Sequence, residues 1–177
     1  KVRSAVRAFK VKAAAGNPDL AARSDLILLA VKPQVMGRVL KELSDKVTSR
    51  TLLISIAAGV TLSGIEKGIG KKVRAVRVMP NTPALVATGA SGLFNAGATD
   101  EGLKVALDIC SSVGKAVVVE NEDLIDTVTA VSGSGPAYYF LLMEEMIKAG
   151  VELGLTEETA KTLVLQTAKG AALLAES

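Results

Sequence analysis

The sequence predicts an α/β domain built on a parallel sheet, followed by a domain made only of helices. Three observations lead to this prediction. Four short apolar runs alternate with helical or loop segments, strand-like patterns stop near residue 121, and two long helical patterns follow. We therefore expect two domains in the 177 residues, at 1–121 and 122–177.

The four apolar runs have the composition of strands that are buried on both faces. They are continuous or nearly so, are rich in branched residues, and are spaced by roughly the length of a crossover. They comprise residues 25–31, 51–56, 73–79 and 116–120. Because crossovers of this kind join parallel strands, we expect a parallel sheet that is covered by helices.

Two segments between these runs have the three-and-four spacing of amphipathic helices, at residues 35–47 and 100–114. Asp100 is well placed at the start of the second helix. The single cysteine, Cys110, lies within it. One cysteine cannot form an internal disulfide or a cysteine zinc site alone, so we expect a buried helix residue.

The second domain is expected to consist of two helices and a short lead-in. The first begins near Pro136 and stops near Gly154, and its apolar residues lie almost all the way round. The next has Thr156 as its cap and acidic residues in its first turn. So few helices cannot cover this much apolar surface, which predicts that two copies of the chain pair here.

The composition excludes several classes of function. The chain has no histidine, which rules out imidazole-based triads and metal sites, and we expect no metal. The net charge of +3 is dispersed along the chain, which argues against a nucleic-acid partner. No long apolar run occurs and the first ten residues are strongly charged, so we expect a cytoplasmic protein without a membrane partner.

Three of the strand-like runs end in small or rigid residues: "LAVKPQV" at 29–35, "SIAAGVTL" at 55–62 and "RVMPNTPALVATGAS" at 77–91. Ligands of open parallel sheets bind beyond the carboxyl ends of the strands, where small residues let a ligand approach the backbone. Each segment alone also fits an ordinary turn. Three in succession favour a ligand-binding edge.

Together with the helices that follow them, the segments "AVKPQ", "SIAAGV", "MPNTPALV" and "EDLIDTVTAVSGSGPAY" resemble the pyrroline-5-carboxylate reductase family. The resemblance runs from about Phe9 to the last residue. It implies a Rossmann-like domain followed by a helical domain through which subunits form a homodimer, or a higher oligomer such as a decamer. It also implies an NAD(P)H-dependent oxidoreductase that reduces the cyclic C=N bond of 1-pyrroline-5-carboxylate to give L-proline, the last step of proline biosynthesis.

Two features of that family are not found in the sequence. The family begins with a strand and a glycine-rich fingerprint, whereas the only early glycine here is Gly16. The family also carries a Ser-Pro-Gly-Gly segment, which would follow Ser177. We therefore expect a partial chain of such an enzyme. The choice between NADPH and NADH stays open, although Arg3 and Arg7 hint at a phosphate.

The resemblance also implies site residues. Glu122 matches a glutamate close to the bound substrate, and a solvated carboxylate at a helix start is the alternative. Ser132, Gly133 and Ser134 lead into the long helix, whose free N–H groups can face an anionic substrate; a hinge between helices is the alternative. The cofactor-binding residues are Asn17, Ala30, Val31, Lys32, Pro33, Ile56, Ala57, Ala58, Asn81 and Thr82.

No catalytic residue is assigned. A protonated imine is already electrophilic, so the site mainly has to align the cofactor with the substrate. One alternative is a β-hydroxyacid dehydrogenase-like reductase, which would use a lysine of the helical domain. Lys148 and Lys169 are the candidates, and neither lies in such a motif. A non-catalytic dimerising scaffold is the other alternative.

Overall fold

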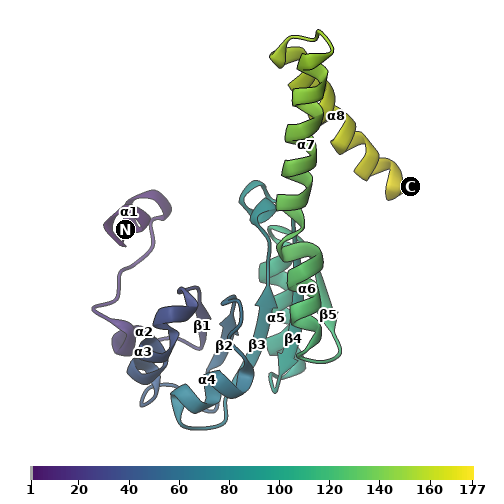
Figure 1. Cartoon of the computed structure of the whole chain (residues 1–177). Helices are drawn as coiled ribbons and strands as arrows, with labels where there is room; N and C mark the ends of the chain where they lie inside the picture. The colour runs from purple at the N-terminus through teal and green to yellow at the C-terminus, as the bar shows by residue number, and fades with distance from the viewer. Residues whose placement is uncertain (1) are drawn as a thin grey trace. The chain divides into compact units, whose positions relative to one another are not determined.

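The structure is a computed structural model that describes residues 2–177. The chain forms two compact units, one ending at Gly133 and the other running from Ser134 to Ser177, and each is described by itself (Figure 1). Residues 122–133, expected in the helical domain, belong to the first unit by their packing. The domain boundary expected after residue 121 stays a prediction.

The first unit contains a five-stranded sheet with the strand order β1-β2-β3-β4-β5. Strands β1 (Leu26–Leu29), β2 (Leu52–Ser55) and β3 (Arg74–Met79) are parallel, which confirms three of the expected strands. Strand β4 (Gly89–Ala96) is antiparallel to β3, and β5 (Gly114–Val119) is parallel to β4. The sheet is therefore mainly parallel, with one change of direction between β3 and β4.

Strand β4 was not expected, because residues 89–96 read "GASGLFNA" and contain no β-branched residue. Small residues suit this strand because neighbouring residues such as Val128 lie close to it. The η1 turn (Thr82–Val86) is the only regular element between β3 and β4, and so short a connection returns the chain antiparallel.

Strand β5 lies at the edge of the sheet, beside β4 alone. The apolar run at 116–120 predicted burial on both faces, which is wrong for this strand: Val117 is 61% exposed and Val118 is 46% exposed. An edge strand has only one neighbour, and its apolar composition therefore does not ensure its burial.

Helices cover both faces of the sheet and enclose two apolar cores. On one face, α2 (Asn17–Ala22), α3 (Pro33–Leu43) and α4 (Leu62–Ile69) pack against inward side chains such as Leu29 and Leu53. On the other face, α5 (Asp100–Ser111) packs against residues such as Ile54 and Val76. The two faces divide the residues of each strand between them, as the pleat requires.

Cys110 belongs to α5 and is buried in the core, which confirms the expected buried helix cysteine. Burial raises the pKa of its thiol above the usual value, and a hydrogen bond with Ser91 offsets part of that shift. A thiol held neutral in this way packs as a small apolar side chain.

Helix α6 (Leu124–Val128) and a π-helical turn (Thr129–Gly133) pack over β3 and β4. This packing requires glycine at one position of β4 and one of the turn: a Cβ on Gly92 would lie 2.6 Å from a methyl of Val128, and one on Gly133 would lie 2.6 Å from Cε of Met79. Gly92 pairs with Met79 across the strands and alternates with Leu93, which faces α5. Helix α6 therefore lies on the same face as α4.

A short helix, α1 (Val2–Phe9), precedes the sheet, and the second unit consists of α7 (Gly135–Glu152) and α8 (Glu157–Ala175). Pro136 lies in the first turn of α7, and the Thr156 hydroxyl accepts a hydrogen bond from the N–H of Thr159; both confirm the expected helix starts. Within the described residues, 2–177, no helix is both long and apolar enough to cross a membrane.

Replacing Gly92 by alanine tests the docking of α6. The new methyl would overlap Val128, so we expect Gly92→Ala to lower the free energy of unfolding by about 1–3 kcal/mol. The double variant Gly92→Ala/Val128→Ala removes the overlap and should recover part of that loss. Urea unfolding measures both. A Gly92→Ala protein as stable as the parent would contradict this packing.

Candidate functional site

The carboxyl ends of β1, β2 and β3 lie together at one edge of the sheet. Leu29, Ser55 and Arg77 occupy one row across these parallel strands, so the loops that follow them lie side by side. This row brings together three of the groups that the sequence predicted as cofactor contacts: residues 30–33, residues 56–58, and residues 81 and 82.

The loop after β1 leads directly into helix α3. Ala30 and Lys32 are exposed, and Pro33 is the first residue of the helix. Lys32 is the N-cap but makes no side-chain hydrogen bond to the first turn. Free N–H groups at a helix start suit an anionic group, and the small Ala30 leaves the nearby backbone accessible.

The loop after β2 is built from small residues. Ala58 and Gly59 are exposed, and Gly59 has a φ of +71°, in the left-handed region that favours glycine. The N–H of Ile56 donates to the carbonyl of Leu29 at 3.2 Å, and that of Ala57 donates to Oγ of Ser55 at 3.4 Å. These bonds tie the start of the loop to the sheet and leave its tip open.

Asn81, after β3, uses its side chain inside the protein. Its Nδ2 donates to the carbonyl of Ser132 at 3.1 Å, and its Oδ1 accepts from the N–H of Ala90 at 2.8 Å. The side chain thereby joins the end of β3 to β4 and to the π-helical turn. Thr82, the next residue, is exposed at the start of η1.

The structure does not bring Asn17 to this edge. Its Nδ2 donates to Oε2 of Glu42 at 2.6 Å, and Glu42 lies nine residues after Pro33, at the other end of α3. At 1.5 Å per residue, this separates the two positions by about 14 Å along the helix. A cofactor contact by Asn17 stays a prediction.

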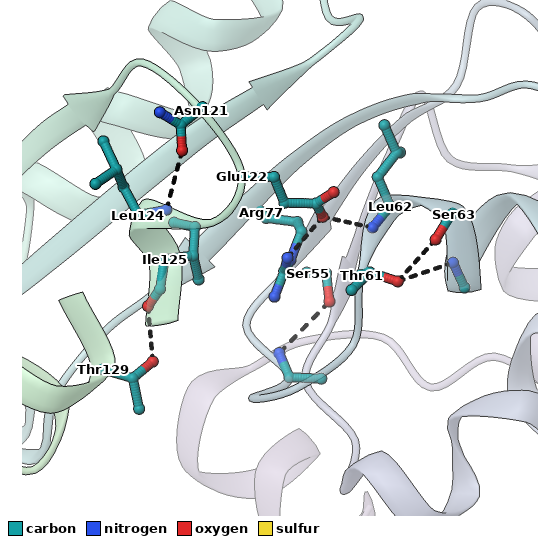
Figure 2. Close-up of polar contacts among 12 residues, drawn as sticks. Ser55, Thr61, Leu62, Ser63, Arg77, Asn121, Glu122, Leu124, Ile125 and Thr129 are labelled. Carbon is teal, nitrogen blue, oxygen red and sulfur yellow. Dashed lines mark hydrogen bonds and ion pairs between the residues drawn. The ribbon is translucent and has the colours of Figure 1, made fainter. Parts of the chain in front are cut away.

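Glu122 is part of a partly buried ion pair. Its Oε1 accepts a hydrogen bond from Nη1 of Arg77 at 2.6 Å and another from the backbone N–H of Leu62 at 2.6 Å. Figure 2 shows the carboxylate lying between Arg77 on β3 and the first residue of α4. The Arg77 side chain is only 5% exposed, whereas that of Glu122 is 27% exposed.

The sequence suggested a substrate contact or a solvated carboxylate at a helix start for Glu122, and neither role includes an ion pair with Arg77. The signal that was missed is Arg77 itself, a charge in the middle of the apolar run "VRAVRVM". It falls on the same face of β3 as Ala75 and Met79. A charged residue at such a position is rarely buried without a partner, so a buried acidic partner was predictable, although its identity was not.

The segment before α7 is held by a hydrogen bond within the turn and by contacts with Met79 and Asn81. The Ser132 hydroxyl donates to the carbonyl of Val128 at 3.1 Å, and Gly133 packs against Met79. Ser134 is the N-cap of α7 and makes no side-chain hydrogen bond to that helix. The hydroxyl of Ser132 therefore serves the π-helical turn, and substrate contacts by these three residues stay a prediction.

The fold places the chain in the class of proteins that have a Rossmann-like α/β domain followed by a helical unit. Two family models match the chain, one described as pyrroline-5-carboxylate reductase dimerisation over residues 122–177 and one as NADP oxidoreductase coenzyme F420-dependent over residues 1–59. Both descriptions concern oxidoreductases.

Individual relatives are similar to the chain over most of its length. A pyrroline-5-carboxylate reductase of Pseudomonas aeruginosa is 46% identical over 96% of this chain and 62% of its own length, and one of Arabidopsis thaliana is 38% identical over 97% and 62%. The solved structure of the Coxiella burnetii pyrroline-5-carboxylate reductase has a TM-score of 0.92 at 43% identity, covering 98% of this chain and 65% of that one. Over nearly its whole length the chain is similar to pyrroline-5-carboxylate reductases.

The chain spans about three fifths of the length of the curated relatives it matches, since the first of them is covered to 62%. A 3-hydroxyisobutyrate dehydrogenase of Mycobacterium tuberculosis is 14% identical, with a TM-score of 0.56 over 80% of this chain and 50% of that one. That likeness extends to the fold alone.

The Arg77–Glu122 pair predicts an asymmetric response to mutation. Glu122→Gln leaves a buried guanidinium without its counter-charge, so it should lower the free energy of unfolding by about 2–4 kcal/mol. Arg77→Met keeps the apolar volume and leaves only a partly exposed carboxylate, so it should cost about 1–2 kcal/mol. Urea unfolding at neutral pH measures both values.

Glu120→Gln is the matched control for this comparison, because Glu120 is exposed and only two residues away. It should change the stability by less than about 0.5 kcal/mol. Equal and small effects of Glu122→Gln and Glu120→Gln would contradict the buried pair.

Proposed function

We propose that this chain is part of a reductase that converts 1-pyrroline-5-carboxylate into L-proline with NADPH or NADH. The observation that supports this most directly is the 46% identity to a relative of that name over 96% of the chain. The likeness therefore covers the strand edge and the helical unit together, which a shared dinucleotide-binding fold alone would not explain.

The residues of the strand edge fit a dinucleotide. Exposed small residues after β1 and β2, an α3 start without a side-chain cap, and an open loop tip at Gly59 all allow close approach to the backbone. A solved relative, the Plasmodium falciparum pyrroline carboxylate reductase, has NADP bound; it is 39% identical with a TM-score of 0.85 over 92% of this chain and 62% of that one. We propose that residues 30–33 and 56–58 hold the dinucleotide here.

The proposed reaction asks little acid-base chemistry of the chain. When bound, the nicotinamide supplies the hydride, and a protonated imine is already electrophilic at carbon. The protein then has to hold the substrate carboxylate, so that the imine carbon is aligned with the nicotinamide. We propose that the residues at 132–134, beside the Asn81 link, contribute to that task.

The reductase class that would use a lysine of the helical domain is less well supported. Lys148, one of its two candidates, forms ion pairs at 2.8 Å with Glu144 and with Glu145. The hydrogen bond from Glu144 and then that from Glu145 raise the pKa of the Lys148 ammonium well above its ordinary value. The side chains of all three residues are exposed on α7, so Lys148 takes part in a solvated surface network and not in a closed site.

The proposed reaction predicts a simple activity. The full-length protein should oxidise NADPH or NADH when given 1-pyrroline-5-carboxylate, seen as loss of nicotinamide absorbance. The same preparation with a β-hydroxyacid and the oxidised dinucleotide is the control and should give no reduction. Turnover of the hydroxyacid alone would support the other reductase class. If neither substrate is turned over, the remaining hypothesis is the non-catalytic dimerising scaffold.

We also propose that the helical unit pairs with that of a second copy, as the description of the matching dimerisation model suggests. Helix α7 presents large apolar side chains on several sides of the helix, and these side chains are exposed in the single chain. They are Tyr138, Tyr139, Phe140, Leu141, Leu142 and Met146. Assembly into a decamer and a cytoplasmic location stay predictions.

A charge on α7 should disrupt this pairing. Leu142 is 58% exposed in the single chain, so Leu142→Glu should leave the fold of one subunit intact and shift the assembly toward monomers or aggregates. Light scattering reports the mass. Lys41→Glu, an exposed charge change on α3, is the control and should keep the parent mass. A parent protein that is a stable monomer at micromolar concentration would remove this proposal.

A further inference from the structure

We propose that the Arg77–Glu122 pair is a positioning device for the loop after β2, so that Glu122 acts on the binding of the dinucleotide and not on that of the imine. This inference rests on the proposed function, because residues 56–58 of that loop are the proposed cofactor contacts. It assigns Glu122 a role different from the substrate contact that the family resemblance implies.

The loop has one firmly held end. Its first N–H groups make bonds of 3.2 Å and 3.4 Å to the sheet, and the N–H of Val60 reaches the carbonyl of Ala57 at 3.4 Å. The bond from Leu62 to Glu122 is much shorter, at 2.6 Å, and has a charged acceptor. Charge-assisted bonds are the stronger ones, so the exit of the loop is held mainly by a side chain that lies 60 residues later in the chain.

Arg77 explains why the carboxylate stays in place. Its neighbour across the sheet is Ser55, the last residue of β2, and it is 5% exposed on the face that carries α4 and α6. A buried guanidinium requires a counter-charge. The position of Glu122 is therefore fixed from β3, and the start of α4 is fixed from Glu122 (Figure 2).

The first turn of α4 is satisfied within the protein. The Leu62 N–H donates to Glu122, and the Gly64 N–H donates to the hydroxyl of Thr61 at 3.1 Å. A carboxylate at this helix start occupies the place that a bound anion would take, and it favours the helix dipole. Helix α4 thus serves as an anchor for the loop, while the start of α3 has no side-chain cap.

Leu62→Pro tests this anchor without touching the ion pair. Proline lacks the N–H that donates to Glu122, is tolerated at the first position of a helix, and suits an extended preceding residue. Thr61 has φ −78° and ψ 161°, which meets that condition. Leu62→Ala is the matched control, because it also loses the leucine side chain but keeps the N–H.

The experiment measures dissociation constants of NADPH and NADH by nicotinamide fluorescence, and separate KM values for dinucleotide and imine, on the full-length protein. Glu122→Gln should weaken dinucleotide binding about tenfold, and Leu62→Pro should weaken it about three- to tenfold relative to Leu62→Ala. The KM for the imine, at saturating dinucleotide, should change less than about twofold. The variant that combines Glu122→Gln with Leu62→Pro should weaken binding by less than the product of the two single effects, because both changes act on the bond between Leu62 and Glu122.

Three results would overturn the inference. Unchanged dinucleotide affinity in a destabilised Glu122→Gln protein would make the pair structural only. A higher KM for the imine with unchanged dinucleotide affinity would make Glu122 a substrate contact. If the parent protein binds neither dinucleotide, the proposed function fails and this inference with it. Glu120→Gln is the control for charge and should match the parent in every constant.

Discussion

Arg77 carries a charge into the interior of the sheet, and much of the candidate site is arranged around the need to balance it. With 5% of its side chain exposed, it cannot be left to solvent. Glu122 provides the balance at 2.6 Å, and the same oxygen holds the start of α4. One carboxylate therefore connects β3, α4 and the segment before α6, which are distant from one another in the sequence.

The sequence predicted the parts of the fold that depend on composition and spacing. Apolar runs identified β1, β2 and β3, and Pro136 and Thr156 marked the starts of α7 and α8. In each case a local property, such as a fixed proline φ or a capping hydroxyl, acts within a few residues of where it is read. Those elements need no knowledge of distant contacts.

The parts that were missed depend on contacts between distant residues. Strand β4 consists mainly of small residues because its neighbours lie close to it: Gly92 makes room for Val128, and a Cβ on Gly89 would lie 2.8 Å from Cβ of Ala84. Strand propensity says nothing about such close approach. The same holds at the site, where the sequence did not predict the bonds of the Asn81 side chain to Ala90 and to Ser132. A cofactor contact by Asn81 stays a prediction.

The edge that follows β1 to β3 combines two properties that rarely occur together in one loop region. The tips of its first two loops consist of small or exposed residues, which lets a ligand reach the backbone, yet small residues supply few side-chain bonds to fix a loop. The fixing contacts are found elsewhere, in Glu122 for the loop after β2 and in Asn81 for the turn after β3. Support from residues 120–133 therefore allows the proposed binding surface to remain bare backbone, which is the arrangement that the proposed reaction would require, because it depends on alignment.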